Sequence, residues 1–313
     1  MNIIKPPPLR RGDVIGICAP ASAPEKDHSL QQGIRYLEQL GYVVKLGNNI
    51  HRKHGYLAGS DMHRASDVHD LFADRQVKAI FAARGGYGSH RILPLLDYQT
   101  IKRNPKILVG YSDITALQLA ILMKTGLLSF SGPMVASDMG KKFTGVAEEW
   151  FWRCVTSTKK LPSLPSKKNF IGAVKKKISS GRLIGGNLSI LAALVGTPYV
   201  PSLNNSILLL EEIDERPYRI DRLLQQLKLG GVLAQSRGAV LGTFVNCLPA
   251  KGKSSLTLRE VFRETFSNYS YPILSGIRYG HVQNPMTMPI GAMIRLDAEQ
   301  KRVVFLESCL SHS

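Results

Sequence analysis

The nine residues VGYSDITAL (109–117) decide the fold of this chain, because they join two kinds of secondary structure at a serine. The apolar stretch KILVG (106–110) is typical of a buried strand, and ITALQLAILMKTG (114–126) has the apolar periodicity of a helix. A strand, an abrupt turn and a helix are therefore predicted. Ser112, at the corner, fits either a helix N-cap or a nucleophile presented where the strand ends.

The same alternation of strand and helix fills the first half of the chain. Strands are predicted at 13–20, 42–46, 77–86, 105–113 and 127–134, and helices at 28–42, 60–74 and 114–126. This order predicts an α/β domain with a mostly parallel sheet and helices on both faces. Sites in such sheets form beyond the carboxyl ends of the strands, and both RGGYGSH (84–90) and GYSDIT (110–115) lie at such ends.

The second half has a different rhythm, which predicts a second, mixed α/β domain. Strands are predicted at 206–213, 238–246 and 271–281, a helix at 216–231, and a closing hairpin at 291–308. Pro217 suits a first helical turn, and Gly230 and Gly231 suit a helix end. A chain of 313 residues favours two domains. We expect them at 1–155 and 179–313, joined by a linker rich in Lys, Pro and Ser at 156–178.

The chain is strongly basic, with 41 Lys and Arg against 23 Asp and Glu, a net charge of +18. Such an excess permits one non-enzymatic function, that of a basic nucleic-acid-binding α/β protein. The basic residues are dispersed outside the linker, however, and no RNA-binding aromatic motif, recognition-helix signature or zinc finger is present. We therefore expect a solvated basic surface and no nucleic-acid partner.

Composition and cysteine usage indicate the cellular setting. The mean hydropathy is −0.05, and no apolar run approaches the roughly 18 residues of a membrane span. The first twenty residues lack the order of segments of a signal peptide, and the four cysteines are scattered without CxxC spacing. We expect a cytoplasmic protein with reduced thiols and no membrane association.

A serine nucleophile needs a base, a group that orients the base, and amides that stabilise the oxyanion. RYGHVQNP (278–285) places His281 directly after a predicted strand, and LLLEEIDERPY (208–218) places Glu211 and Glu212 at the end of an apolar strand. Each motif is weak alone, because a surface histidine and a solvated acidic corner are common. Ile114 also replaces the second glycine of the Gly-x-Ser-x-Gly elbow. The other histidines lack carboxylates at metal-ligand spacing, so we expect no metal and no cofactor.

Together these segments resemble one known family, the LD-carboxypeptidases, or muramoyltetrapeptide carboxypeptidases. The resemblance runs from about Gly12 to the final hairpin. Its clearest segments are FAARGGYGSHRILPLLD (81–97), VGYSDITALQLAI (109–121), SFSGPM (129–134), GGNLSILAALVGTP (185–198), LLLEEIDERPYRIDRLLQQL (208–227) and YGHVQNPMTMPIGA (279–292). It implies a Rossmann-like N-terminal domain and a C-terminal domain that supplies a glutamate and a histidine.

The resemblance also implies roles for single residues. Ser112 would be the nucleophile, His281 the base and Glu211 the carboxylate that orients the base. The backbone amides of Asp113 and Gly86 would form the oxyanion hole. The family often has Glu-Asp where this chain has Glu211-Glu212, so a register one residue further along stays open.

The implied reaction is hydrolysis of the amide that joins the terminal D-alanine to murein tetrapeptide, in cell-wall recycling by a homodimer. Arg84 would meet the terminal carboxylate of this small peptide, unless it pairs with an acidic neighbour instead. Some members of the family are microcin-immunity peptidases that act on peptidyl- or aminoacyl-nucleotides, and this function stays open as an alternative. The sequence shows no clear aromatic platform for a nucleobase, which favours murein.

Overall fold

The computed structural model describes residues 2–141, 143–166, 168–169 and 177–312, and it divides the chain into two compact units. Unit 1 comprises Met1–Leu161, Gln283–Gly291 and Ser308–Ser313, and unit 2 comprises Pro162–Val282 and Ala292–Glu307. This division differs from the expected boundaries, because two late segments belong to unit 1. Residues 167 and 170–176 of the expected linker lie outside the described residues.

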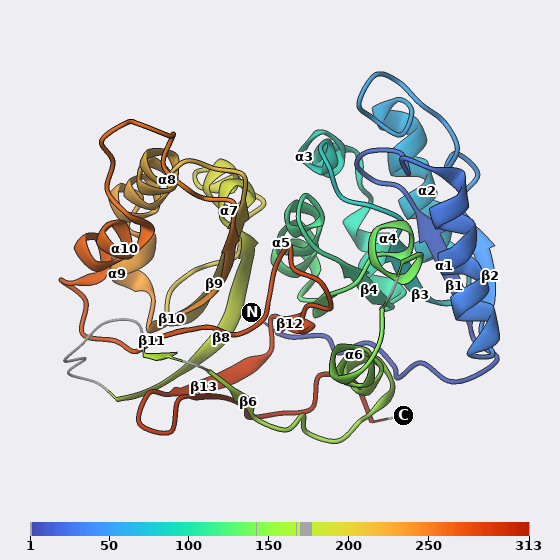
Figure 1. The fold of residues 1–313 in the computed structure, drawn as a ribbon. Coiled ribbons are helices and arrows are strands. Elements are labelled where there is room, and N and C mark those ends of the chain that lie inside the picture. Colours follow the sequence, from blue (N-terminus) through green and yellow to red (C-terminus); the bar gives the residue numbers. More distant parts are fainter. Residues whose placement is uncertain (1, 142, 167, 170–176, 313) are drawn as a thin grey trace. The chain divides into compact units, whose positions relative to one another are not determined.

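Unit 1 is built on a mostly parallel sheet of six strands, in the order β12-β5-β4-β3-β1-β2 (Figure 1). The strands are β1 (Val14–Cys18), β2 (Val43–Leu46), β3 (Val77–Ala82), β4 (Ile107–Gly110), β5 (Ser129–Ser131) and β12 (Met288–Ile290). The helices are α1 (Asp27–Gln39), α2 (Asp61–Ala73), α3 (Ser89–Ile92), η1 (Leu93–Leu95), α4 (Tyr98–Arg103), α5 (Ile114–Thr125), η2 (Val135–Met139) and α6 (Val146–Thr156). Only β12 runs antiparallel to its neighbour, β5, among these strands. The predicted alternation is confirmed.

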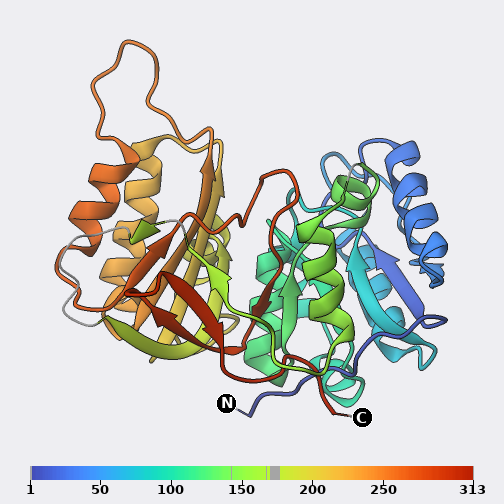
Figure 2. The same ribbon diagram turned by 60° about the horizontal axis from the view of Figure 1, so that its bottom comes forward.

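Helices lie on both sides of this sheet, as Figure 2 shows. The helices α2, α3, α4 and α5 contact one another in one layer, while α1 contacts η2 in another. All four residues of β4 are buried, and α5 is buried along ten of its twelve residues, as expected of a helix that is apolar on every side. In the sheet, β1 lies between β2 on one side and β3 on the other, so the strand order reverses direction at β1. The carboxyl ends of β1 and β3 therefore flank the point where ligands bind in such sheets.

Unit 2 contains a mixed sheet of eight strands, in the order β6-β14-β13-β8-β9-β10-β11-β7. The strands are β6 (Leu164–Pro165), β7 (Lys168–Asn169), β8 (Ile178–Asn187), β9 (Ser206–Ile213), β10 (Gly238–Val245), β11 (Ile273–Ser275), β13 (Met293–Asp297) and β14 (Arg302–Phe305). The helices are α7 (Leu188–Leu194), α8 (Pro217–Leu229), α9 (Val232–Gln235) and α10 (Leu258–Phe266). The central strands β8 to β11 are parallel, and the outer pairings are antiparallel.

The local signals of the second half mostly hold. Pro217 begins α8, Gly230 ends it, and β13 and β14 form the predicted hairpin. The strand predicted at 271–281 is wrong in length, since β11 ends at Ser275. The residues after Ser275 form a loop. The sequence pattern alone did not distinguish this loop from the end of a strand.

The four cysteines are buried, and burial raises the pKa of Cys18 far above its ordinary range. Among the described residues, no helix combines the length and the apolar character needed to cross a membrane.

Candidate active site

The residues predicted for the site are divided between the units. Ser112, Asp113, Gly86 and Arg84 belong to unit 1, whereas Glu211 and His281 belong to unit 2.

Ser112 lies in a turn that forces its backbone into an unusual conformation. Its φ angle is +63°, in the left-handed region that residues other than glycine rarely adopt. The strand β4 ends at Gly110 and α5 begins at Ile114, so the chain reverses within three residues. A side chain at position 110 would lie 2.9 Å from Ile114 Cγ2, so Ile114 fits because position 110 is glycine. The turn therefore has the strain of a nucleophile elbow without its second glycine.

The predicted N-cap role of Ser112 is wrong. The N-cap residue of α5 is Asp113, and no side chain at that position caps the helix. An N-cap residue usually has an extended backbone, which a φ of +63° excludes for Ser112. The carbonyl of Ser112 accepts a hydrogen bond from Thr115 N at 2.9 Å. The cap therefore gives no structural reason for a serine side chain here.

Asp113 ties the serine turn to the glycine-rich loop. Its side chain is almost fully buried, and Oδ2 accepts a hydrogen bond from Ser89 N, at the start of α3, at 2.7 Å. Burial raises the pKa of Asp113 above its ordinary value, although the hydrogen bond from Ser89 opposes the shift. The turn and the start of α3 are thus held together by a buried contact.

The loop RGGYG (84–88) lies against Ser112. A Cβ atom at Gly85 would be 3.3 Å from Ser112 Oγ, so the two segments touch. Gly86 has a φ of +103°, and a Cβ there would be 2.4 Å from Ser22 Oγ, which leaves room only for glycine. Ser22 fixes the loop, since its amide donates to Gly85 O at 3.1 Å and its Oγ accepts from Tyr87 N at 3.2 Å.

Sequence reasoning missed the role of Ser22. The only signal was its position just beyond the carboxyl end of β1, the strand beside β3 in the sheet. The structure thus brings Gly86, Asp113 and Ser112 into one region of unit 1. The roles of Asp113 and Gly86 in an oxyanion hole stay predictions.

Arg84 follows the alternative that the sequence left open. Its Nη2 lies 2.6 Å from Glu25 Oε1, and its Nη1 donates to Ala23 O at 3.3 Å. Glu25 is mostly exposed, so this ion pair is weak enough to open for another carboxylate.

Unit 2 brings Glu211 and His281 together. Glu211 Oε2 and His281 Nδ1 are 2.8 Å apart, and the glutamate side chain is almost fully buried at the end of β9. The prediction that His281 directly follows a strand is wrong, since it lies six residues beyond the end of β11. Backbone hydrogen bonds hold its segment instead, from Thr243 N to Tyr279 O at 2.8 Å and from Val282 N to Gly280 O at 2.8 Å.

Gly280 makes the close contact of Glu211 and His281 possible. Its φ is +108°, and a Cβ there would lie 2.5 Å from Glu211 Oε2. The motif YGH therefore needs glycine beside the histidine for two reasons, its backbone conformation and the carboxylate next to it.

Glu212 contacts a different set of groups. Oε2 accepts a hydrogen bond from Ser189 N at 2.8 Å, and Oε1 accepts from Asn187 Nδ2 at 2.7 Å. Asn187 pairs with Glu211 in the sheet register, and its Nδ2 also donates to Glu211 Oε1 at 3.2 Å. Sequence reasoning missed Asn187, although its place before a helix in GGNLS marked it as an N-cap, which it is. Asn187 Nδ2 thus donates to both carboxylates.

The described residues contain no group of histidine, cysteine and carboxylate side chains that could hold a metal ion.

One feature that the sequence analysis did not find is an exposed aromatic pair. The rings of Tyr56 and Tyr87 lie 5.4 Å apart and are roughly perpendicular, and Tyr87 directly follows Gly86.

Comparisons with known proteins identify the family of this chain. Models of the LD-carboxypeptidase N-terminal and C-terminal domains match residues 15–132 and 180–296. The probable murein peptide carboxypeptidase of Bacillus subtilis is 38% identical over 300 residues, which cover 96% of this chain and 93% of that protein. The chain also resembles two solved structures over nearly all of their length.

One of them is a muramoyltetrapeptide carboxypeptidase from Oxalobacter formigenes, with 31% identity and a TM-score of 0.81 over 93% of this chain and 97% of that one. The other is the microcin C7 self-immunity protein MccF in complex with aspartyl sulfamoyl adenosine. It has 28% identity and a TM-score of 0.86, over 98% of this chain and 100% of that one. The two-domain α/β fold and the matching relatives define a serine-type carboxypeptidase. The chain belongs to the LD-carboxypeptidase family.

Proposed function

We propose that this enzyme releases the terminal D-alanine from murein tetrapeptide, with Ser112 as the nucleophile. The hydrogen bond of 2.8 Å between Glu211 and His281 supports this most directly, because it orders an imidazole beside a buried carboxylate. If Nδ1 carries the proton that Glu211 accepts, Nε2 is the nitrogen that takes the Ser112 proton. The names of the murein carboxypeptidase relatives support the choice of substrate.

The proposed reaction has two halves. His281 removes the proton of Ser112 Oγ, which attacks the carbonyl carbon of the amide bond to D-alanine. The amides of Asp113 and Gly86 stabilise the oxyanion, and His281 then protonates the leaving D-alanine amine. A water molecule, activated by His281, cleaves the resulting ester to release the shortened peptide and restore Ser112. No cofactor takes part.

Arg84 is proposed to bind the carboxylate of the terminal D-alanine. It precedes the two glycines that lie against Ser112 and Ser22, and it has a planar guanidinium that suits a carboxylate. Substrate would exchange for Glu25 as the partner of Arg84. We further propose that the enzyme acts in the cytoplasm as a homodimer, to be tested by cell fractionation and by light scattering during gel filtration.

A second candidate function is hydrolysis of an aminoacyl-nucleotide amide. The likeness to MccF favours it, and so does the exposed pair of Tyr56 and Tyr87, which offers a nucleobase a surface to stack on. The same serine, histidine and glutamate would carry out the reaction. Only groups that contact the leaving portion of the substrate would differ.

Incubation with three substrates tests the proposal. These are murein tetrapeptide, the same peptide ending in L-alanine, and an aminoacyl sulfamoyl adenosine. We expect release of D-alanine from the first and little reaction with the other two. Release of the nucleoside sulfamate with no D-alanine would establish the second candidate instead.

A further inference from the structure

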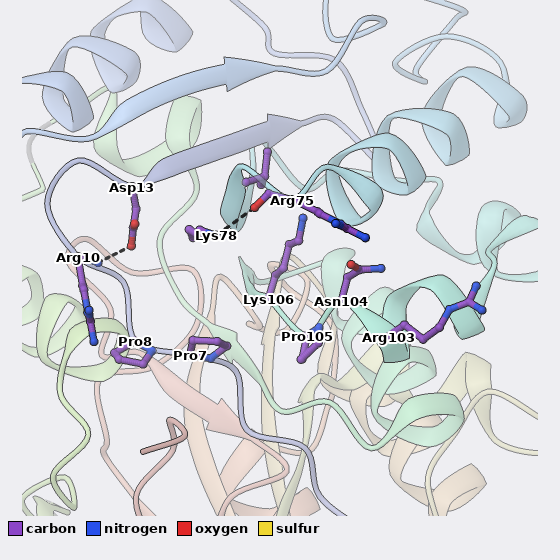
Figure 3. A pocket seen from close by; sticks show the side chains of 11 residues that line it. Pro7, Pro8, Arg10, Asp13, Arg75, Lys78, Arg103, Asn104, Pro105 and Lys106 are labelled. Carbon is purple, nitrogen blue, oxygen red and sulfur yellow. Dashed lines mark hydrogen bonds between the residues drawn. The ribbon is translucent and has the colours of Figure 1, made fainter. Parts of the chain in front are cut away.

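A basic cavity of about 660 Å³ lies at the amino ends of the strands of unit 1 (Figure 3). Its charged lining comes from the segment before β1, the loop between α2 and β3, β3 itself, the end of α4 and the residue before β4. The charged residues are Arg10, Asp13, Arg75, Lys78, Arg103 and Lys106. Ser112 follows the carboxyl end of β4, so the cavity and the serine turn lie at opposite ends of one strand. The cavity is therefore not part of the candidate active site.

The cavity carries an excess of positive charge. Five of its side chains are cationic, and Asp13 is the single carboxylate among its lining residues. Asp13 Oδ2 accepts a hydrogen bond from the backbone of Arg10 at 2.7 Å, the contact drawn in Figure 3. Lys78 Nζ donates to a carbonyl, that of Arg75, at 3.0 Å.

Three cations of the cavity have no carboxylate in an ion pair with them. Within the described part of the chain, Arg75, Lys78 and Lys106 form no ion pair with a carboxylate, although Asp74, which pairs with Lys45, also attracts Lys106. Figure 3 shows Arg10 and Asp13 on one side of the cavity and Arg75 on the other. Positive charge thus surrounds the space from more than one element.

Lys106 is the unusual member of the group, because it is 95% buried, being 5% exposed. Its ammonium donates to Leu71 O at 2.8 Å and to Asp74 O. An ammonium has three N–H groups, so one remains for a further acceptor. Burial, assisted by the nearby cations Lys78 and Lys45 and opposed by Asp74, lowers the pKa of Lys106 to about 8. An anion in the cavity would offset this crowding of positive charge.

We propose that this cavity binds a small phosphorylated anion carrying at least two negative charges. The volume is that of a site for a small molecule, whereas a nucleic acid would need an extended basic track. Arg75 supplies a guanidinium fork that matches phosphate oxygens, and Lys78 and Lys106 supply ammonium groups.

Isothermal titration of the full chain with inorganic pyrophosphate tests the proposal. We expect one site, with Arg75→Gln and Lys78→Gln each weakening binding about tenfold, as loss of one charge-assisted hydrogen bond implies. Lys102→Gln is the matched control, because Lys102 is an exposed cation next to Arg103 on α4 that does not line the cavity. It should change the affinity less than about twofold.

A titration with ADP identifies the source of the phosphate. Tighter binding than that of pyrophosphate indicates a nucleotide, and equal binding indicates the phosphate groups alone, both as proposed. Absence of binding to both probes at millimolar concentration would overturn the proposal. An equal loss of affinity in Lys102→Gln and Arg75→Gln would also overturn it, since such a result indicates diffuse attraction by the basic surface. Preferential binding of duplex DNA that Arg75→Gln abolishes would overturn it as well.

Discussion

The backbone of Ser112 adopts a conformation that costs free energy. A left-handed φ in a residue other than glycine costs about 1–3 kcal/mol, and no side-chain cap compensates for it at the start of α5. The sequence motif alone predicted the serine at a strand end but not the strain. A φ angle depends on how the turn packs against Ile114 and the glycine loop, and the order of residues does not encode that packing.

Two substitutions separate strain from chemistry at this residue. Ser112→Gly should unfold with a free energy about 1 kcal/mol larger than that of Ser112→Ala, because only glycine relieves the left-handed conformation. Both variants should be inactive. Urea denaturation of the two proteins measures the difference, and equal stabilities would show that position 112 is not strained.

Gly280 is predicted to be essential through its contact with Glu211. Gly280→Ala would place a methyl group 2.5 Å from Glu211 Oε2 and should displace the carboxylate from His281. We expect kcat to fall about 10²-fold, as small displacements of catalytic groups do. The matched control is Gly252→Ala, since Gly252 also has a positive φ, +72°, but a side chain there would contact nothing within 4 Å. Similar loss of activity in both variants would point to unfolding rather than to Glu211.

At the scale of the element, β9 distinguishes between its two glutamates. Glu211 Oε2 lies 2.8 Å from His281 Nδ1, whereas Glu212 accepts hydrogen bonds from Ser189 N and Asn187 Nδ2. The apolar residues before them did not show which glutamate is on the side of His281, because the strand is buried on both faces. The sequence therefore left the register open, and it was the resemblance to the family that favoured Glu211.

The two glutamates should respond differently to loss of charge. Glu211→Gln should lower kcat by about 10²–10⁴-fold with little change in KM, because an amide does not stabilise the imidazolium. Glu212→Gln should instead lower the free energy of unfolding, since Glu212 accepts hydrogen bonds from Ser189 and Asn187. Steady-state kinetics and denaturation of both variants decide the matter. A crippled Glu212→Gln with an active Glu211→Gln would reverse the assignment.

Elements with local signals were predictable, and elements formed by distant pairing were not. The helix α1 and the hairpin β13–β14 follow from periodicity and a turn signal. In contrast, β12 pairs with β5 across more than 150 residues, and β6 and β7 are two-residue strands. Pairing over such distances depends on tertiary packing, so no pattern within the segment identifies it.

At the scale of the whole molecule, buried charge should make stability depend on pH. The pKa of Lys106 is lowered from 10.5 to about 8, so between these pH values the unfolded chain binds more protons at this group than the folded one. The contribution of Lys106 to the free energy of unfolding should therefore rise with pH across this window. The wild type should show this slope relative to Lys106→Met when both are denatured from pH 7.5 to 10.5. Parallel pH profiles would contradict the shift.

The central claim of this account is that Ser112 is the nucleophile. Release of D-alanine from murein tetrapeptide by Ser112→Ala, compared with the wild type, tests it most directly. The N-cap residue of α5 is Asp113 rather than Ser112, so the mutant should fold, and its thermal unfolding provides that control. We predict D-alanine release by the wild type and loss of turnover by at least about 10³-fold in the mutant. Normal release by a folded Ser112→Ala protein would contradict the account.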